Sequence, residues 1–312
     1  MTHGPSALVF SPAVVLTVTV EEGVDSPDIH IHAGGQGVWV ARLLVELGVA
    51  ASLVGPFGGE IGLVLRTLVA DDGIDLTAVD VAGANGAYVH DRRSGERVVV
   101  ADSAPAALSR HEVDELYGTV LVGGLEADVC VLTGPGLHPV LPPEVYGRLA
   151  GDLRANGRVV IADLSAEHQD HAVRAGVSVL KVSAEELRRD GRIHSESLAS
   201  VVGCIGQLAA AGADAVVVTR AEHGSVVLAD GVLSVVEAPT VEAVERRGAG
   251  DSLTAGMTAG LARRLPLIES LRLGTAAGAL NVTRRGLGTG GRDEIERLAE
   301  HITVRELDVE VE

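Results

Sequence analysis

Apolar residues along this chain follow two periods that alternate for most of its length. Runs of nearly continuous apolar residues are typical of strands buried on both faces of a parallel sheet. Segments with apolar residues three and four positions apart predict amphipathic helices. We therefore expect strands at 49–54, 128–133, 158–164, 178–182 and 213–219, and helices at 36–47, 60–70, 143–155, 196–211, 250–264, 267–284 and 292–302. This alternation predicts an α/β fold with a mostly parallel sheet covered on both faces.

Two other stretches carry strand patterns without intervening helices. Residues 7–20 are expected to be extended, and 74–100 to form short strands that turn at Arg93-Ser94-Gly95. We expect strands from about 7–32 and 85–100 to form a small second sheet, which would act as a lid. The chain has no repeats, low-complexity tracts or long linkers, so residues 1–312 are predicted to be a single domain with this lid.

Composition excludes several classes of function. The formal net charge of −18 argues against a nucleic-acid partner, because phosphate backbones are bound by clustered Lys and Arg. No apolar run approaches the roughly 20 residues that a membrane span needs, and the N-terminus lacks the basic flank of a signal peptide. We therefore expect a cytoplasmic protein with no membrane association. Cys130 and Cys204 lie in apolar surroundings, which favours buried free thiols.

The segment Gly248-Ala249-Gly250-Asp251 carries the strongest chemical signal. It leads directly into a predicted helix, and the first N–H groups of a helix have no partner within the helix and attract anions. Asp251 is then either a plain helix cap or a base that accepts a proton while the N–H groups hold a phosphate. Two more glycine-containing segments follow predicted strands, at 33–39 and 219–224. Each alone is an ordinary turn, or bare backbone that a ligand can approach closely.

In this order the motifs resemble those of the ribokinase-type carbohydrate kinases of the PfkB family, nearest the phosphofructokinase and tagatose-phosphate kinase branch. The resemblance runs from about residue 7 to 306 and rests on a few short segments. These are Gly34-Gly35-Gln36-Gly37-Val38-Trp39, the strand end Thr133-Gly134-Pro135, Asp163, Lys181-Val182-Ser183-Ala184-Glu185-Glu186, the loop from Thr219 to Gly224, and Gly248 to Asp251.

The resemblance implies a ribokinase-like three-layer α/β/α sandwich with a β lid, and a kinase that uses ATP and Mg²⁺ to phosphorylate an alcohol. Asp251 would be the general base, and the backbone of Gly248, Ala249 and Gly250 would form the anion hole. Glu186 would hold the magnesium ion through water. The remaining implied residues are Lys181, Ser183, Glu186, Thr219, Gly224, Arg247 and Asn281 for the nucleotide and Val15, Gly34, Gly35, Gln36, Trp39 and Thr133 for the acceptor. The resemblance also allows a monovalent cation, and lid pairing between subunits implies a homodimer.

The chain departs from the family pattern mainly on the acceptor side. Val15 stands where the branch has an Asp, Gln36 where it has a Lys, and Trp39 where it has an Asn. Val15 cannot bond a hydroxyl, and the Trp39 ring is either core packing or a platform for an apolar ligand. These exchanges favour an acceptor with an apolar portion over the fructose phosphates that the branch handles.

Basic side chains differ from the family pattern as well. The arginine that the branch places near residue 87 is replaced by Asn85-Gly86-Ala87, and arginines of the lid are candidates to take its role: Arg92, Arg93 and Arg97. Before the anion hole, Arg246 and Arg247 are either a solvated pair or added charge near the phosphates. Three histidines on predicted lid strands are expected on the surface, with acceptor contact as the alternative: His30, His32 and His90.

Three hypotheses for function therefore stay open. The first is an ATP-dependent kinase that phosphorylates a hydroxyl of a sugar, a sugar phosphate or a related small molecule. The second is a kinase of a nucleoside or another non-sugar alcohol, which Val15 and Trp39 favour. The third is a non-catalytic relative that binds a nucleotide or metabolite, which the altered acceptor motif permits and the retained Asp251 and Glu186 oppose.

Overall fold

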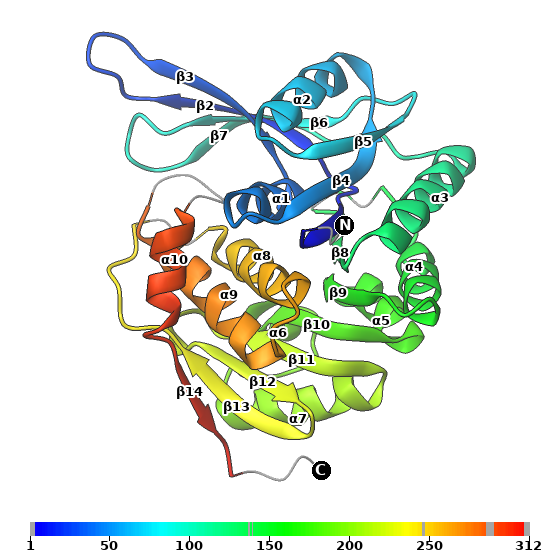
Figure 1. The fold of residues 1–312 in the computed structure, drawn as a ribbon. Helices are drawn as coiled ribbons and strands as arrows, with labels where there is room; N and C mark the ends of the chain where they lie inside the picture. The colour runs from blue at the N-terminus through cyan, green and yellow to red at the C-terminus, as the bar shows by residue number, and fades with distance from the viewer. Residues whose placement is uncertain (1–3, 137, 139, 245–246, 285–289, 309–312) are drawn as a thin grey trace.

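A computed structural model describes residues 4–136, 138, 140–244, 247–284 and 290–308 of the chain (Figure 1). In this part of the chain the central feature is a ten-stranded sheet, with seven parallel strands and three antiparallel strands at one edge. Across the sheet the order is β14 (Thr303–Glu306), β13 (Val232–Glu237), β12 (Ser225–Ala229), β11 (Ala213–Thr219), β10 (Val177–Ser183), β9 (Val159–Asp163), β8 (Val129–Thr133), β1 (Ser6–Phe10), β4 (Ala50–Phe57) and β5 (Asp75–Asp80). Strands β12 and β13 form an antiparallel hairpin.

Helices cover both faces of this sheet. One layer holds α1 (Gln36–Glu46), α2 (Gly59–Asp71), α8 (Ala249–Ala262), α9 (Leu267–Val282) and α10 (Arg292–Ala299). The other layer holds α3 (Arg110–Glu126), α4 (Glu144–Ala155), α5 (Ala166–Ala175), α6 (Ala184–Arg189) and α7 (Leu198–Ala210). Alternate residues of one strand serve the two cores: Val9 packs in the first layer and Leu8 and Phe10 in the second. This two-sided burial explains why the strands are apolar at almost every position.

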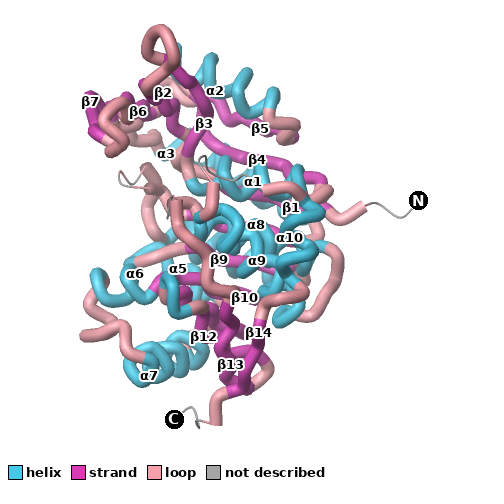
Figure 2. The backbone as a smooth tube through the Cα atoms, turned by 90° about the vertical axis from the view of Figure 1, so that its left-hand side faces the viewer, coloured by secondary structure: helices cyan, strands magenta, loops and turns pink. Residues whose placement is uncertain are grey.

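A second sheet of four strands stands apart from the main one, at the upper end of both views (Figures 1 and 2). It contains, in sheet order, β3 (Asp28–Gly34), β2 (Val15–Glu21), β6 (Gly86–Asp91) and β7 (Val98–Ser103). Strands β2 and β6 are parallel, and the other two pairs are antiparallel. We call this sheet the lid. The boundary predicted for its first part is wrong at one end, because residues 6–10 form β1 at the middle of the main sheet.

Some elements of the fold were not expected from the pattern. The longest, α3, buries only Leu116, Val120 and Gly124, so its sequence shows little amphipathic contrast. A local signal does mark its start, since Ser109 and Glu112 form a reciprocal capping box. Helices α5 and α6 and the edge strand β14 are short, and their apolar patterns are correspondingly weak.

Strand register brings the predicted motifs to one edge of the main sheet. In the parallel ladder Thr133 of β8 pairs with Asp163 of β9, and Asp163 pairs with Lys181 of β10. One step further along, Ser183 of β10 pairs with Thr219 of β11. Open α/β sheets bind ligands at the carboxyl ends of their parallel strands. The fold therefore places the candidate residues where such folds have their sites.

Two predictions made from composition can be compared with the structure. Cys130 and Cys204 are both buried free thiols, as predicted. In the described part of the chain, no helix combines the length and the apolar character that crossing a bilayer would require.

Candidate active site

The Gly248–Asp251 turn begins helix α8, as the sequence predicts. Gly248 has the left-handed backbone conformation, with φ 75° and ψ 0°, which glycine adopts without strain. Its carbonyl accepts the first helical bond, from Ser252 N–H at 2.8 Å. The N–H groups that follow belong to the first turn, where no helical carbonyl is available to them. The turn thus presents backbone donors and the positive end of a helix dipole.

Asp251 occupies the first turn of α8 and lines a cavity of about 600 Å³ between the lid and the main sheet. Its withdrawal from water, together with the charge of Asp163, raises the pKa of the Asp251 carboxyl to about 7. Lys181 opposes this rise, because its ammonium favours the ionised form. A carboxyl with a pKa near neutral exchanges a proton readily at physiological pH, which suits a general base.

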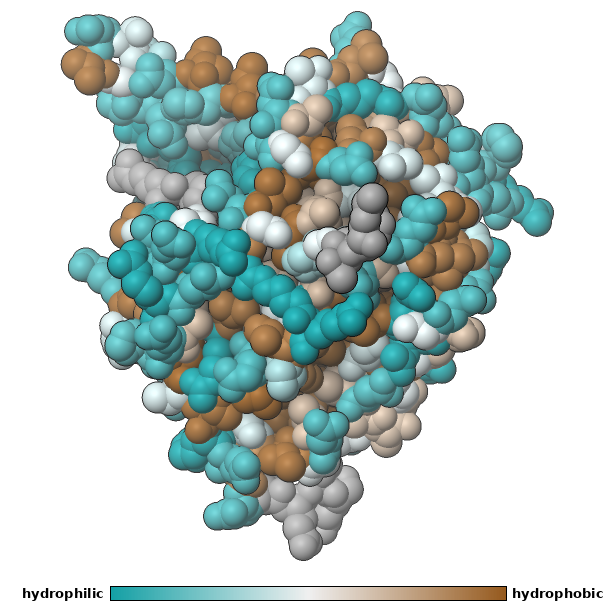
Figure 3. All heavy atoms as spheres, viewed as in Figure 1, coloured by the Kyte–Doolittle hydropathy of each residue, from teal (hydrophilic) through white to brown (hydrophobic). Residues whose placement is uncertain are grey.

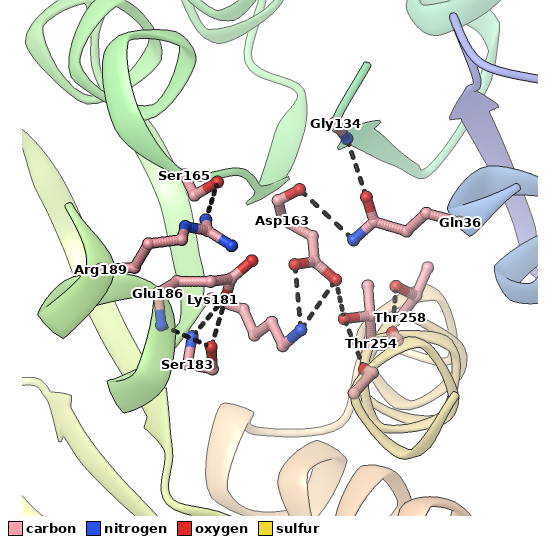
Figure 4. Close-up of polar contacts among 11 residues, drawn as sticks. Gln36, Gly134, Asp163, Ser165, Lys181, Ser183, Glu186, Arg189, Thr254 and Thr258 are labelled. Carbon is pink, nitrogen blue, oxygen red and sulfur yellow. Dashed lines mark hydrogen bonds and ion pairs between the residues drawn. The ribbon is translucent and has the colours of Figure 1, made fainter. Parts of the chain in front are cut away.

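Beneath the turn lies a buried network centred on Asp163 (Figure 4). Its carboxylate pairs with Lys181 Nζ at 3.0 and 3.1 Å and accepts a hydrogen bond from Thr254 Oγ1 at 2.6 Å. Burial acts to lower the pKa of Lys181, but the carboxylates of Asp163, Glu186 and Asp251 together raise it. The Lys181 ammonium therefore stays charged with its charge balanced by Asp163. A Cβ on Gly250 would lie only 2.9 Å from Lys181 Nζ, so this ammonium directly supports the turn.

Gln36 links the acceptor-side motif to the sheet edge. Its Oε1 accepts from Gly134 N–H at 2.9 Å, and its Nε2 donates to the carbonyl of Asp163 at 3.5 Å (Figure 4). Thr133 is fully buried, and its hydroxyl donates to the carbonyl of Phe10 at 2.7 Å. The cavity wall beside it is formed by the backbone of Gly134 and Gly136 instead. Both polar side chains predicted for the acceptor therefore make bonds within the protein.

The other acceptor-side residues meet at the base of the lid. Val15 and Trp39 line the cavity, and Gly35 lines it with φ 112°, where a Cβ would lie 2.1 Å from the carbonyl oxygen of Ala13. Gly34 is buried beside them, with no room for a Cβ next to Thr17 Oγ1. Trp39 is 7% exposed, with the guanidinium of Arg42 at 4.8 Å from its ring centre. Most of the indole is thus core packing, and a small part faces the cavity.

Residues predicted for the nucleotide side lie further along the sheet edge. Ser183 caps helix α6: its hydroxyl accepts from Glu186 N–H at 3.1 Å, while Ser183 N–H and Oγ donate to Glu186 Oε2. Thr219 ends β11, and Gly224 follows the short helical turn η1 (Ala221–His223) with φ 70°. These residues are not among those that line the cavity.

Arg247 and Asn281 flank the start of the turn. Asn281, fully buried on α9, donates from Nδ2 to the carbonyl of Arg247 at 2.7 Å, so it holds the chain just before Gly248. Arg247 itself lines the cavity. Arg246, predicted as its partner, lies outside the described residues.

Comparison with known proteins now decides the family. The model of the pfkB family carbohydrate kinases matches residues 12–294, nearly the whole chain. This protein belongs to the pfkB family. It is therefore a kinase, a phosphotransferase with an alcohol group as its acceptor, and its three-layer sandwich with a lid is the ribokinase-like fold.

Relatives of this pfkB kinase have phosphofructokinase names. It is 29% identical to the ATP-dependent 6-phosphofructokinase isozyme 2 of Mycobacterium tuberculosis, over 94% of this chain and 88% of the relative. It is 26% identical to the 1-phosphofructokinase of Bacillus subtilis, over 88% and 89% of the two chains. Among solved structures, phosphofructokinase-2 from Escherichia coli in complex with potassium superimposes with a TM-score of 0.81 at 25% identity, covering 95% of this chain and 98% of the other.

The lid histidines of the pfkB kinase differ in part from the prediction that they lie on the surface. His30 and His32 line the cavity, and His32 lies 5.5 Å from the ring of Trp39. His90 is buried in the lid, where its Nε2 accepts a hydrogen bond from the guanidinium of Arg97. His30 is exposed, as predicted, although it also lines the cavity. The surface prediction is wrong for His32, which is half-buried, and for His90, which is buried. Alternation explains the result, since His30 and His32 are two apart and share the strand face toward the cavity.

The three lid arginines proposed to take the role of the family's arginine differ in whether they line the cavity. Arg92 and Arg97 line the cavity. Arg93 is instead paired with the carboxylate of Asp91, at 2.6 Å.

Some cavity residues were missed by the sequence reasoning. Thr17, Thr19 and Glu21 share the cavity face of β2, and Tyr88 of β6 lines the cavity too. The polar positions of β2 alternate with Leu16, Val18 and Val20, and this period-two pattern could have been recognised from the sequence alone. Thr254 had a signal as well, because it follows Asp251 by three residues on the same helix face. Nothing in the pattern marks Tyr88.

Proposed function

We propose that this protein is an ATP- and magnesium-dependent kinase that phosphorylates a hydroxyl of a sugar, a sugar phosphate or a related small molecule. The observation that carries the proposal is Asp251: a carboxyl with a pKa of about 7, in the first turn of α8, that faces a cavity beside a turn of backbone donors. The names of its relatives support ATP as donor and a phosphorylated sugar as one class of acceptor.

Each part of the site has a role in such a transfer. Asp251 accepts the proton of the attacking hydroxyl, and the N–H groups after Gly248 stabilise the charge on the transferring phosphoryl. Asp163, fixed by Lys181 and Thr254, keeps a negative charge near Asp251 and so maintains its basicity. ATP supplies the phosphoryl group. Positioning and electrostatic stabilisation account for most of the catalysis in this class of reaction.

The residues present fit magnesium that is held mainly by phosphates and water. Within the described ranges, no three His, Cys, Asp or Glu side chains gather closely enough to bind a metal ion by themselves. Mg²⁺ retains several waters and is commonly held through one or two carboxylates plus substrate phosphates. The charge of Glu186 reaches both Lys181 and Asp251, as their shifted pKa values show. This charge supports Glu186 as the residue that would hold the ion through water.

A kinetic experiment tests this function. We would measure ATP turnover with a panel of sugars, sugar phosphates, nucleosides and other alcohols. Asp251→Asn should lower kcat about 10²- to 10⁴-fold for any active acceptor, because the general base is lost. Asp75→Asn, which changes an exposed carboxylate on β5, is the control. If no acceptor stimulates turnover while ATP and a metabolite still bind, the non-catalytic alternative replaces the proposal.

The proposal includes a homodimer formed through the lid. On β3 the residues that alternate with the cavity-facing histidines point the other way, and Ile29 and Ile31 are 66% and 52% exposed. Ile31 pairs in register with Val18, which pairs with Val89, so an apolar row crosses the outer lid face. We call these residues, Val18, Ile29, Ile31 and Val89, the outer lid row. Apolar residues are visible on the lid in Figure 3. A cytoplasmic location and a monovalent cation remain further predictions.

A further inference from the structure

Helix α8 carries two fully buried threonines one turn apart, Thr254 and Thr258. A threonine inside a helix commonly donates to the carbonyl of the residue four positions earlier. Thr258 does so, because its Oγ1 donates to the carbonyl of Thr254 at 2.6 Å. Thr254 differs, since its Oγ1 lies 2.6 Å from Asp163 Oδ2 as well as 3.1 Å from the carbonyl oxygen of Gly250 (Figure 4). Thr254 therefore has a partner outside its own helix.

The hydroxyl of Thr254 has a single proton for these two oxygens. The carboxylate oxygen is both the nearer one and the charged one, and 2.6 Å is the length of a charge-assisted bond from a hydroxyl to a carboxylate. Thr254 thus donates to Asp163, while the contact with Gly250 keeps the hydroxyl beside the turn. One side chain therefore joins the Gly248–Asp251 turn to the end of β9.

The Asp163 carboxylate is held by side-chain donors from two elements. Lys181 Nζ on β10 lies 3.0 Å from Oδ1 and 3.1 Å from Oδ2, and Thr254 approaches Oδ2 from α8. Asp163 and Lys181 are both buried, so a lost donor is not simply replaced by water. Without the hydroxyl, Oδ2 would keep the longer bond to Lys181 alone, and the carboxylate could turn about its Cβ–Cγ bond.

We propose that Thr254 is a positioning residue for phosphoryl transfer, whose hydroxyl fixes the Asp163 carboxylate beside Lys181 and beneath the Gly248–Asp251 turn. This inference rests on the proposed function, in which Asp251 is the general base. Thr254 does not act on the substrates directly, because it is fully buried and is not among the residues that line the cavity. It acts through Asp163.

The orientation of Asp163 has an electrostatic effect on the base. The charged groups that act on the Asp251 carboxyl are Asp163, Lys181 and Glu186, from β9, β10 and α6. A hydroxyl that donates to Asp163 points the positive end of its dipole at this cluster and offsets part of the negative charge. Its removal therefore raises the pKa of Asp251 further, because added negative potential disfavours ionisation. A base with a higher pKa is protonated up to a higher pH, so the loss of activity should be larger at pH 6 than at pH 9.

Substitutions of the two threonines test this role. We would measure kcat and KM from pH 6 to 9 for wild type, Thr254→Val, Thr254→Ser and the control Thr258→Val, with an acceptor that the wild type uses. Valine keeps the shape of threonine without the hydroxyl, and serine keeps the hydroxyl. Thr254→Val should lower kcat about 10- to 100-fold at pH 7, the loss of a hydrogen bond to a charged group, with KM for ATP unchanged. Thr254→Ser should recover most of this loss, and Thr258→Val should match wild type.

The outcomes separate this inference from the proposed function. Unchanged kcat in Thr254→Val overturns the role of Thr254 while the kinase stands. Equal losses in Thr254→Val and Thr258→Val, or no recovery with serine, overturn it as well, because they indicate an effect of helix packing. A loss of the same size at every pH also overturns it, since the effect would not pass through the charge at Asp251. A wild type that uses no acceptor rejects the proposed function and this role together. Thr254→Ala replaces the valine variant if that variant does not fold.

Discussion

At Asp251, ionisation makes the folded state less stable. An ordinary Asp has a pKa of 3.8, and burial with the nearby charge of Asp163 raises that of Asp251 to about 7. Between these two values the folded protein binds a proton that the unfolded chain has released. Stability therefore falls as pH rises across this window, by the linkage between protonation and folding.

This linkage gives a prediction for Asp251→Asn. The amide cannot ionise, so the variant should be nearly as stable as wild type at pH 4 and more stable at pH 8. Its Tm advantage over wild type should grow steadily between these values. Thermal melts at a series of pH values would measure the difference. A constant difference would contradict the raised pKa.

Trp39 offers a second test at the same scale. It is the sole tryptophan, it lines the cavity beside His32, and it belongs to the motif that the sequence predicts to contact the acceptor. Its fluorescence should change when an acceptor binds and hardly change with ATP alone. Titrations with each ligand separately would show this. An equal response to ATP would mean that the ring senses the nucleotide instead.

The contacts of single residues were the part of the structure that the sequence predicted least completely. The role of Gly248 and Asp251 at a helix start could be predicted, because a Gly-rich turn before an apolar helix is a local pattern. The internal bonds of Gln36 and Thr133 join residues far apart in the chain, which no local pattern reveals. The contact between His90 and Arg97 depends in addition on the strand pairing within the lid.

Helix α8 shows how one element couples the turn to the network beneath it. It presents Gly250 against Lys181 at its start and Thr254 against Asp163 one turn later. The start of α8 is thus in direct contact with the carboxyl ends of β9 and β10. A substitution in the turn should therefore displace the Lys181 side chain without unfolding the protein.

Gly250→Ala tests this coupling. The added Cβ would meet Lys181 Nζ at 2.9 Å, the end of a flexible side chain that can shift. We expect a folded protein whose kcat falls about 10- to 100-fold, as expected when reacting groups are misplaced by about an ångström. Gly203→Ala, at an open position of α7, is the control and should raise stability by up to about 1 kcal/mol. Unchanged kcat in Gly250→Ala would argue against the coupling.

Elements with strong periodicity could be predicted from the sequence, and weakly patterned ones could not. Strands β4, β8, β9, β10 and β11 of the main sheet lie within a few residues of their expected positions, because burial on both faces leaves a long apolar run. Helix α3 was missed, since few of its residues are buried, and residues 7–10 were assigned to the wrong sheet. An extended pattern identifies a strand but says nothing about which sheet it joins.

For the whole molecule, the outer lid row predicts how two copies associate. Ile31→Glu would place a charge in the middle of that row and should shift the protein from dimer toward monomer, because burying an unpaired charge is costly. Analytical ultracentrifugation would measure the shift. Val122→Glu, at an exposed apolar position of α3, is the control and should leave the assembly unchanged. A wild type that is monomeric at micromolar concentration would remove the proposed dimer.

The wall of the cavity is divided along the chain. Thirteen of its eighteen lining residues come from positions 13–97, and the Gly248 turn and its supporting network come from beyond position 160. Selection for a new acceptor can therefore act on one stretch of the gene while the other is inherited intact. Recombination near residue 105, between the lid and α3, would exchange these thirteen wall residues as a block and leave the Gly248 turn unchanged. A kinase built in this way can change its acceptor while it keeps the same phosphoryl-transfer site.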